Sequence, residues 1–162
     1  MLSQSFGQEN VFRASRSIPP GGDYSKFLTD GIDSSKVMLA VIGRTWLEKT
    51  IKSLGDLNRP RDWVREEIAR AFEKEIPVIP ILLSGTSRLT DADLPPEISQ
   101  LSSIQYIRFE YRSIESGFAQ IRSAVSKYIP LRAGECREDS VARALMDLSE
   151  DIRQLRSRLA PE

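Results

Sequence analysis

The sequence predicts a doubly wound α/β domain built on a parallel β-sheet, and three observations support this prediction. Two continuous apolar runs, residues 37–42 and 77–83, end at Gly43 and at Ser84-Gly85. Continuous apolarity is typical of strands that helices cover on both faces, as in parallel sheets. Segments with helical periodicity separate these runs, and the resulting alternation of strands and helices is that of a doubly wound domain.

The first elements follow from short local signals. We expect a short strand at residues 10–13 and a strand at 37–42. A helix is expected between them because Asp23, a good N-cap, precedes an apolar stripe with helical spacing. A second helix is expected after Asp62, where the same combination of aspartate and apolar stripe recurs.

The second half of the domain continues the alternation. The strand at 77–83 is followed by a short helix over 94–101, which begins around Pro95-Pro96. Residues 104–109 alternate in polarity, which predicts a weaker strand at a sheet edge. A longer helix over 114–128 completes the domain.

After residue 130 the composition changes. Residues 131–138 predict a polar linker, and residues 139–160 predict an amphipathic helical appendage with apolar residues at alternating steps of four and three. This helix either docks on its own domain or forms a short coiled coil with a partner. The apolar positions of this seam are Val141, Leu145, Leu148, Ile152, Leu155 and Leu159.

Composition excludes several classes of function. Lys+Arg and Asp+Glu balance at 23 each, so no net charge favours nucleic acid or an anionic membrane. The chain has no histidine, which removes Ser-His-Asp and Cys-His nucleophile systems and histidine-based metal sites. The single cysteine, Cys136, fits a reducing compartment, and no apolar stretch approaches the ~20 residues of a membrane span. Without a signal peptide, the chain is expected in the cytoplasm.

Two motifs are candidates for function. In the loop over 17–23, Pro20-Gly21 suits the central positions of a type II turn, and Ile18 is an apolar residue of the kind that docks on other proteins. Trp63 and Glu67 lie four residues apart at the start of a helix, on one face. A carboxylate at a crevice rim beside an aromatic ring can bind sugar hydroxyls and stabilise an oxocarbenium charge, although most helix glutamates are simply solvated. Neither GxxxxGK[ST] nor GxGxxG is present.

The order of several motifs resembles bacterial TIR (Toll/interleukin-1 receptor) domains over roughly Phe6 to Pro130. These motifs are NVFR at 10–13, SIPPG at 17–21, VIG at 41–43, WL at 46–47, DWVREEI at 62–68 and IPVIPI at 76–81. The resemblance implies a flavodoxin-like fold over residues 1–130. The family's TIR–TIR contacts are carried by the BB loop, which corresponds here to Ile18, Pro19, Pro20 and Gly21.

The resemblance also implies a chemistry. In TIR enzymes that cleave NAD+, the glutamate four residues after the helix tryptophan is catalytic, and here that residue is Glu67, with Trp63 as a substrate-binding wall. NAD+ would be the substrate, without a cofactor or metal. The function expected is that of a signalling or defence protein that hydrolyses NAD+ when assembled with other TIR domains. The alternative is a non-enzymatic TIR–TIR interaction module.

Two departures from the family pattern qualify these expectations. The family's first strand and most of its first helix are absent, because only residues 1–8, similar to the end of that helix, precede the 10–13 strand. In the expected strand order 2-1-3-4-5, this absence leaves two unpaired strand edges. A wrong start site, a truncated gene that does not fold alone, or completion by another chain would each account for it. Ala14-Ser15-Arg16 also stand where the family usually has acidic residues.

Overall fold

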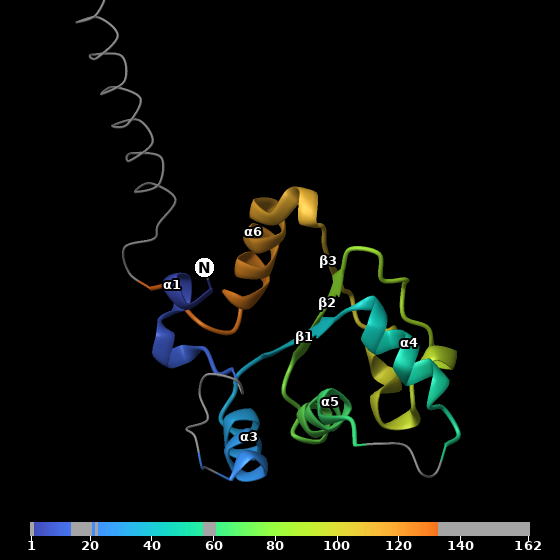
Figure 1. Cartoon of the computed structure of the whole chain (residues 1–162). Helices are drawn as coiled ribbons and strands as arrows, with labels where there is room; N and C mark the ends of the chain where they lie inside the picture. The colour runs from blue at the N-terminus through green and yellow to red at the C-terminus, as the bar shows by residue number, and fades with distance from the viewer. Residues whose placement is uncertain (1, 14–20, 22, 57–60, 133–162) are drawn as a thin grey trace, which may run out of the picture.

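A three-stranded parallel sheet forms the centre of the molecule (Figure 1). The computed structural model describes residues 2–13, 21, 23–56 and 61–132. Strands β1 (Met38–Ile42), β2 (Val78–Leu83) and β3 (Ile107–Phe109) lie in the order β1-β2-β3, with Met38 opposite Val78 and Ile81 opposite Ile107. The parallel α/β architecture predicted from the sequence is therefore confirmed, and so is the edge position of β3.

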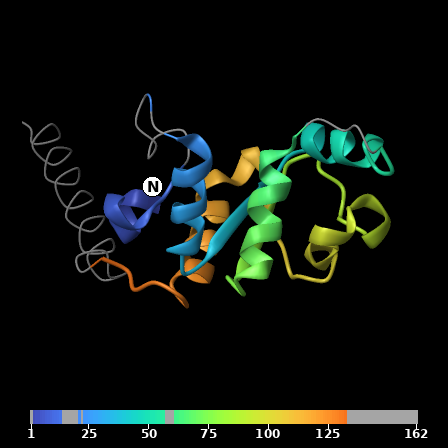
Figure 2. The ribbon, with the colours of Figure 1, turned by 90° about the horizontal axis from the view of Figure 1, so that it is seen from below.

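Helices cover both faces of this sheet (Figures 1 and 2). One layer contains α1 and α6, and the opposite layer contains α3, α4, α5 and η3. The bounds of the helices are α1 Leu2–Phe6, η1 Gln8–Asn10, α3 Tyr24–Asp33, α4 Arg44–Lys52, α5 Trp63–Glu73, η2 Asp91–Asp93, η3 Pro96–Ser102, η4 Tyr111–Ser113 and α6 Ile114–Val125.

The two cores follow from the alternation of side chains along the strands. In β2, Val78 and Leu82 pack towards α3, α4 and α5, whereas Ile79 and Ile81 pack towards α1 and α6. Because successive side chains of a strand point to opposite faces, a strand buried on both faces must be apolar at every position. This is the reason why the apolar run at 77–83 is continuous.

Pro80 is accommodated within β2 by the position of β3. The β2–β3 ladder begins only at Ile81 opposite Ile107, and Ser84 N donates to Phe109 O at 2.9 Å. In a strand, the backbone groups that face one neighbouring strand recur at every second residue, so the nitrogen of Pro80, like that of Ser84, faces β3. Pro80 comes before Ile81, the first residue of β2 that pairs with β3. The missing N–H of a proline therefore costs no ladder bond here.

The strand predicted at residues 10–13 is not present, so this prediction was wrong. Residues Gln8–Asn10 form the 3-10 helix η1, and residues 11–13 continue without strand structure. The Asn10 side chain donates from Nδ2 to Phe6 O at 2.8 Å, and its backbone N–H donates to Gly7 O. A strand needs a neighbour to pair with, and no described strand lies on this side of β1 for residues 10–13 to join.

Other elements differ in extent from the prediction. Helix α4 was not predicted because Leu47 is its only buried apolar residue, and a single position gives no periodicity. The short helix after Pro95 is a 3-10 helix, β3 has three residues, and α6 ends at Val125. Residues 133–138 of the linker and the helix predicted at 139–160 lie outside the described residues.

The contact between α6 and β3 yields a stability prediction. A Cβ built on Gly117 would lie 2.6 Å from Cδ2 of the Phe109 ring, which also packs edge-on against Phe118. Gly117→Ala should therefore overpack this contact and lower the free energy of unfolding by about 1–3 kcal/mol. Gly43→Ala is the control, because its Cβ would meet only Leu83 Cδ1 at an ordinary 3.7 Å. Equal thermal stability of the two variants would contradict the prediction.

Candidate functional site

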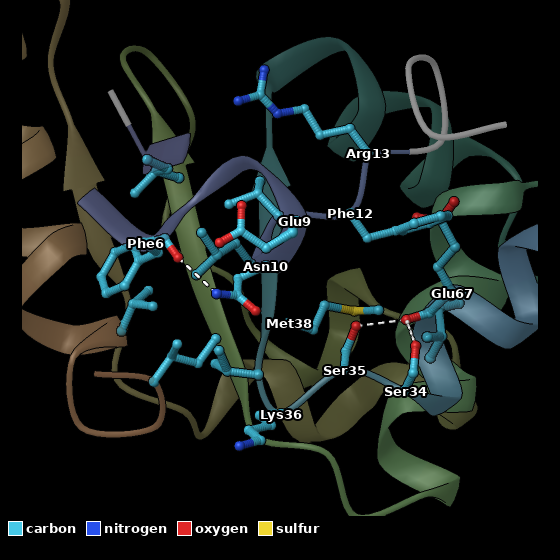
Figure 3. A pocket seen from close by; sticks show the side chains of 18 of the residues that line it. Phe6, Glu9, Asn10, Phe12, Arg13, Ser34, Ser35, Lys36, Met38 and Glu67 are labelled. Carbon is cyan, nitrogen blue, oxygen red and sulfur yellow. Dashed lines mark hydrogen bonds between the residues drawn. The ribbon is translucent and has the colours of Figure 1, made fainter. Parts of the chain in front are cut away.

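A cavity of about 660 Å³ opens along the edge of β1 that faces away from β2 (Figure 3). Residues of α1, η1 and the following segment 11–13 line one side of it, and the end of α3 with the turn at 34–36 lines another. The backbone and side chains of β1 form its floor, and α5 contributes a single residue, Glu67. Such a size is within the range of small-molecule sites in proteins.

Glu67 reaches the cavity because α5 is capped and buried in a fixed orientation. The N-cap Asp62 accepts a hydrogen bond from Arg65 N at 3.1 Å and another from Trp46 Nε1 at 3.2 Å. The first bond satisfies one of the free N–H groups of the helix start, and the second ties α5 to α4. Ile68 and Ala71 are fully buried against the sheet. Glu67, adjacent to Ile68, is consequently held half-buried at the border of the core.

Two contacts, one before and one after Glu67 along α5, hold α3 beside α5. Trp63 packs edge-on against Tyr24, with the ring centroids 4.9 Å apart. Arg70 binds Asp33 through two nitrogens at 2.7 and 2.6 Å. Positions 63, 67 and 70 lie on one face of a helix, so Glu67 is on the side of α5 that faces α3, between these two contacts.

The Glu67 carboxyl lies in an environment that disfavours its charge. Burial is the first cause that raises its pKa above the ordinary value, and repulsion from the Asp62 carboxylate is the second. No described residue donates a hydrogen bond to Glu67. Ser34 and Ser35 line the same cavity, and their hydroxyls donate to Gly31 O at 3.2 and 2.7 Å. Glu67 therefore offers a poorly compensated negative charge to any ligand in the cavity.

Phe12 supplies an aromatic wall that the sequence analysis did not identify. Its ring lies directly on the backbone of Gly31 in α3, where a Cβ would be 2.6 Å from Phe12 Cζ. Figure 3 shows Phe12 beside Glu67 at the cavity, and 37% of Phe12 is exposed. The only sequence signal was its place in the NVFR motif, which predicted a strand rather than a cavity wall.

The structure does not bring Trp63 and Glu67 into one pocket. Trp63 is not among the described residues that line the cavity, and its ring packs between Tyr24 and the Arg61 guanidinium, 3.6 Å from the centroid. The side chain of Glu66 turns to Arg61, which it binds at 2.8 Å.

The loop expected to carry TIR–TIR contacts is described at one position only. Gly21 has φ +81°, the value that the second central residue of a type II turn requires. Ile18, Pro19 and Pro20 lie outside the described residues.

No group of three or more Cys, Asp or Glu side chains among the described residues could hold a metal ion. No helix in the same part of the chain combines the length and apolarity needed to cross a membrane.

The family model described as TIR domain matches residues 2–125, which include the sheet, Glu67 and all the residues that line the cavity except Ile129. No curated protein matches the chain.

The raised pKa of Glu67 depends in part on Asp62, which can be tested by titration. In Asp62→Asn the side chain remains a good N-cap, and its carbonyl can still accept from Trp46, but the negative charge is removed. The pKa of Glu67 should therefore fall while staying above its ordinary value, since burial remains. Carboxyl chemical shifts of Glu67 followed by NMR against pH would measure this. An unchanged pKa would show that Asp62 does not act on Glu67.

The same shift makes folding stability depend on pH. Because the pKa of Glu67 is higher in the folded than in the unfolded chain, ionisation of this group destabilises the fold. Glu67→Gln should match the wild type below pH 4.5, the ordinary pKa of the group, and exceed it in free energy of unfolding once the pH passes the raised value. Urea unfolding across this range would measure the difference. A variant less stable than wild type at neutral pH would contradict the prediction.

Proposed function

Because the chain belongs to the TIR domain family, a family of signalling and defence domains, we propose that it hydrolyses NAD+ at the nicotinamide–ribose bond. The observation that carries this proposal is the Glu67 carboxyl, half-buried at the cavity with a raised pKa and with no hydrogen-bond donor among the described residues. A carboxylate in such a place is well suited to stabilise a positive charge that develops on a sugar.

The other residues of the cavity match the parts of NAD+. Ser34 and Ser35 line the same cavity as Glu67 and can accept hydrogen bonds from ribose hydroxyls (Figure 3). The Phe12 ring offers an apolar face to a planar base or to the ribose. Arg13 and Lys36 bring positive charge to the same cavity, which suits an anionic pyrophosphate.

The reaction proposed is a dissociative hydrolysis. The bond between ribose C1′ and the nicotinamide nitrogen breaks, and its electron pair neutralises the charge of the pyridinium. Glu67, as the carboxylate, offsets the oxocarbenium charge left on the ribose. Water then adds to C1′ and releases a proton to solvent, so that the products are nicotinamide and ADP-ribose.

TIR domains generally act through TIR–TIR contacts, and we extend this property to the chain as a proposal. Self-association through the loop containing Ile18, Pro19, Pro20 and Gly21 would place the cavities of several copies in one assembly. The partners proposed are other TIR domains, including further copies of this chain.

A second candidate function is a non-enzymatic interaction module, and the position of Trp63 favours it. Its ring lies outside the cavity, in a surface cluster with Tyr24, which is 41% exposed, and with Arg61. Aromatic and arginine side chains are typical of the centres of protein interfaces. For this function, binding to another TIR domain should survive Glu67→Ala and be lost on Pro20→Ala.

Substitution of the two neighbouring glutamates tests the enzymatic proposal. Glu67→Gln removes the charge in the cavity and should lower the rate of NAD+ hydrolysis by about 100-fold or more. Glu66→Gln is the matched control, because Glu66 pairs with Arg61 away from the cavity, and it should leave the rate unchanged. Release of nicotinamide by the assembled protein, followed by chromatography, measures both. Absence of hydrolysis in the wild type at high protein concentration, or equal rates in wild type and Glu67→Gln, would refute the proposal.

A further inference from the structure

Helices α3 and α5, which both contribute residues to the cavity, are joined by an ion pair. Arg70 of α5 donates from Nε to Asp33 Oδ1 at 2.7 Å and from Nη2 to Asp33 Oδ2 at 2.6 Å. The hydrogen bond from Arg70 is the first cause that lowers the pKa of Asp33, so this carboxylate is held in its charged form. Two parallel bonds between planar groups fix a direction as well as a distance.

Both residues of the pair are close, along the chain, to residues that line the cavity. Asp33 is the last residue of α3, and Ser34 and Ser35 follow it directly. Arg70 lies three residues after Glu67, on the same face of α5. The ion pair thus links the turn that carries the two serines to the helix that carries the carboxyl (Figure 3).

Apolar packing also holds the two helices together, but with less precision at this end of α3. Leu28 and Ile32 of α3 share one core with Ile68 and Ala71 of α5, and the two helices lie side by side (Figure 2). Burial of apolar surface is favourable but has no direction, so it sets the position of one helix along the other less sharply than a directional bond does. The aromatic contact described above lies at the other end of α3.

The exposure of the ion pair indicates a role in position rather than in stability. The side chains of Arg70 and Asp33 are 31% and 36% exposed, and ion pairs in contact with solvent contribute little to the stability of a fold. Arg44 and Glu48 form a pair of the same kind, but four residues apart within α4. That pair joins no two elements, whereas the pair of Asp33 and Arg70 spans 37 positions of the chain.

We propose that Asp33 and Arg70 are positioning residues, whose ion pair holds Ser34 and Ser35 in a fixed relation to Glu67. The inference rests on the proposed NAD+ hydrolysis, in which the serines hold the ribose hydroxyls while Glu67 offsets the charge at C1′. These two tasks act on one sugar, so the groups that perform them must keep their relative position. A displacement of about 1 Å between such groups can lower a rate on the order of 100-fold.

Substitution of Arg70 by lysine tests the proposal, because it keeps the positive charge and removes the two-pronged geometry. For Arg70→Lys, the kcat of NAD+ hydrolysis by the assembled protein should fall about tenfold or more, with a smaller change in KM, since the ribose is bound but poorly placed. Arg44→Lys is the matched control, with the same exchange in an ion pair inside one helix, and should leave both constants unchanged. The thermal unfolding midpoints of both variants should stay close to that of the wild type.

Substitution of Asp33 shows whether the two residues act as a pair. Asp33→Asn should lower kcat in the same way as Arg70→Lys. The double variant should be no slower than the slower single variant, because both changes remove one interaction. Losses that multiply in the double variant would contradict the proposal.

The pKa of Glu67 reports the position of α3 without any substrate. Burial is the first cause that raises this pKa, and α3 lies against the face of α5 that carries Glu67. A loosened α3 exposes Glu67, so Arg70→Lys should bring its pKa closer to the ordinary value, and Arg44→Lys should not. Because the charge at position 70 is kept, such a shift reports burial. Carboxyl chemical shifts followed by NMR against pH measure it.

These measurements separate the failure of this inference from the failure of the proposed function. Hydrolysis by the wild type with the same kcat in Arg70→Lys would overturn the inference and leave the proposed function intact. An unchanged pKa of Glu67 in Arg70→Lys would also overturn it, whatever the effect on kcat. Absence of hydrolysis in the wild type would refute the proposed function, and the pKa comparison would then decide alone whether the ion pair holds α3 against Glu67.

Discussion

The parallel pairing of β1 with β2 is the constraint on which the rest of the molecule depends. The register that sets Met38 opposite Val78 also decides which side chains of β1 enter each core and which backbone groups face outwards. Helix α5 packs its buried residues Ile68 and Ala71 into one of these cores, which fixes the position of Glu67. The cavity then lies beside the outer edge of β1, between residues of α1 and α3, where the described residues contain no further strand.

The fold holds Glu67 in a position where its ionised carboxyl lowers the stability of the folded chain. The carboxyl is half-buried, its pKa is raised first by burial and then by Asp62, and Asp62 cannot be dispensed with because it caps α5 and accepts from Trp46. Asp62 thus stabilises the start of α5 and, through charge repulsion, disfavours the ionised form of Glu67. A structure selected for stability alone would place a neutral residue at position 67, and such local conflicts are common at functional sites.

The sequence predicted most of the sheet and only part of the site, for reasons that can be traced to particular residues. The runs at 37–42 and 77–83 and the caps Asp23 and Asp62 are local signals, and the strands and helices formed where they indicated. The strand at 10–13 failed because strand formation depends on a neighbour, which local sequence does not report. Phe12 was missed for the same reason. Trp63 was assigned to the pocket of Glu67 by its spacing, but spacing could not reveal that Tyr24 and Arg61 hold its ring elsewhere.

Glu67 and Phe12 border one cavity but come from elements that are held in different ways. Glu67 is carried by α5, which is capped by Asp62 and packs Ile68 and Ala71 into the core. Phe12 lies in a segment without strand structure, and its ring rests on Gly31 of α3. The position of α3 beside α5 is set by the contact of Tyr24 with Trp63 and by the ion pair of Arg70 with Asp33. These two contacts therefore decide how the Phe12 ring is placed relative to Glu67, although neither contact lies in the cavity.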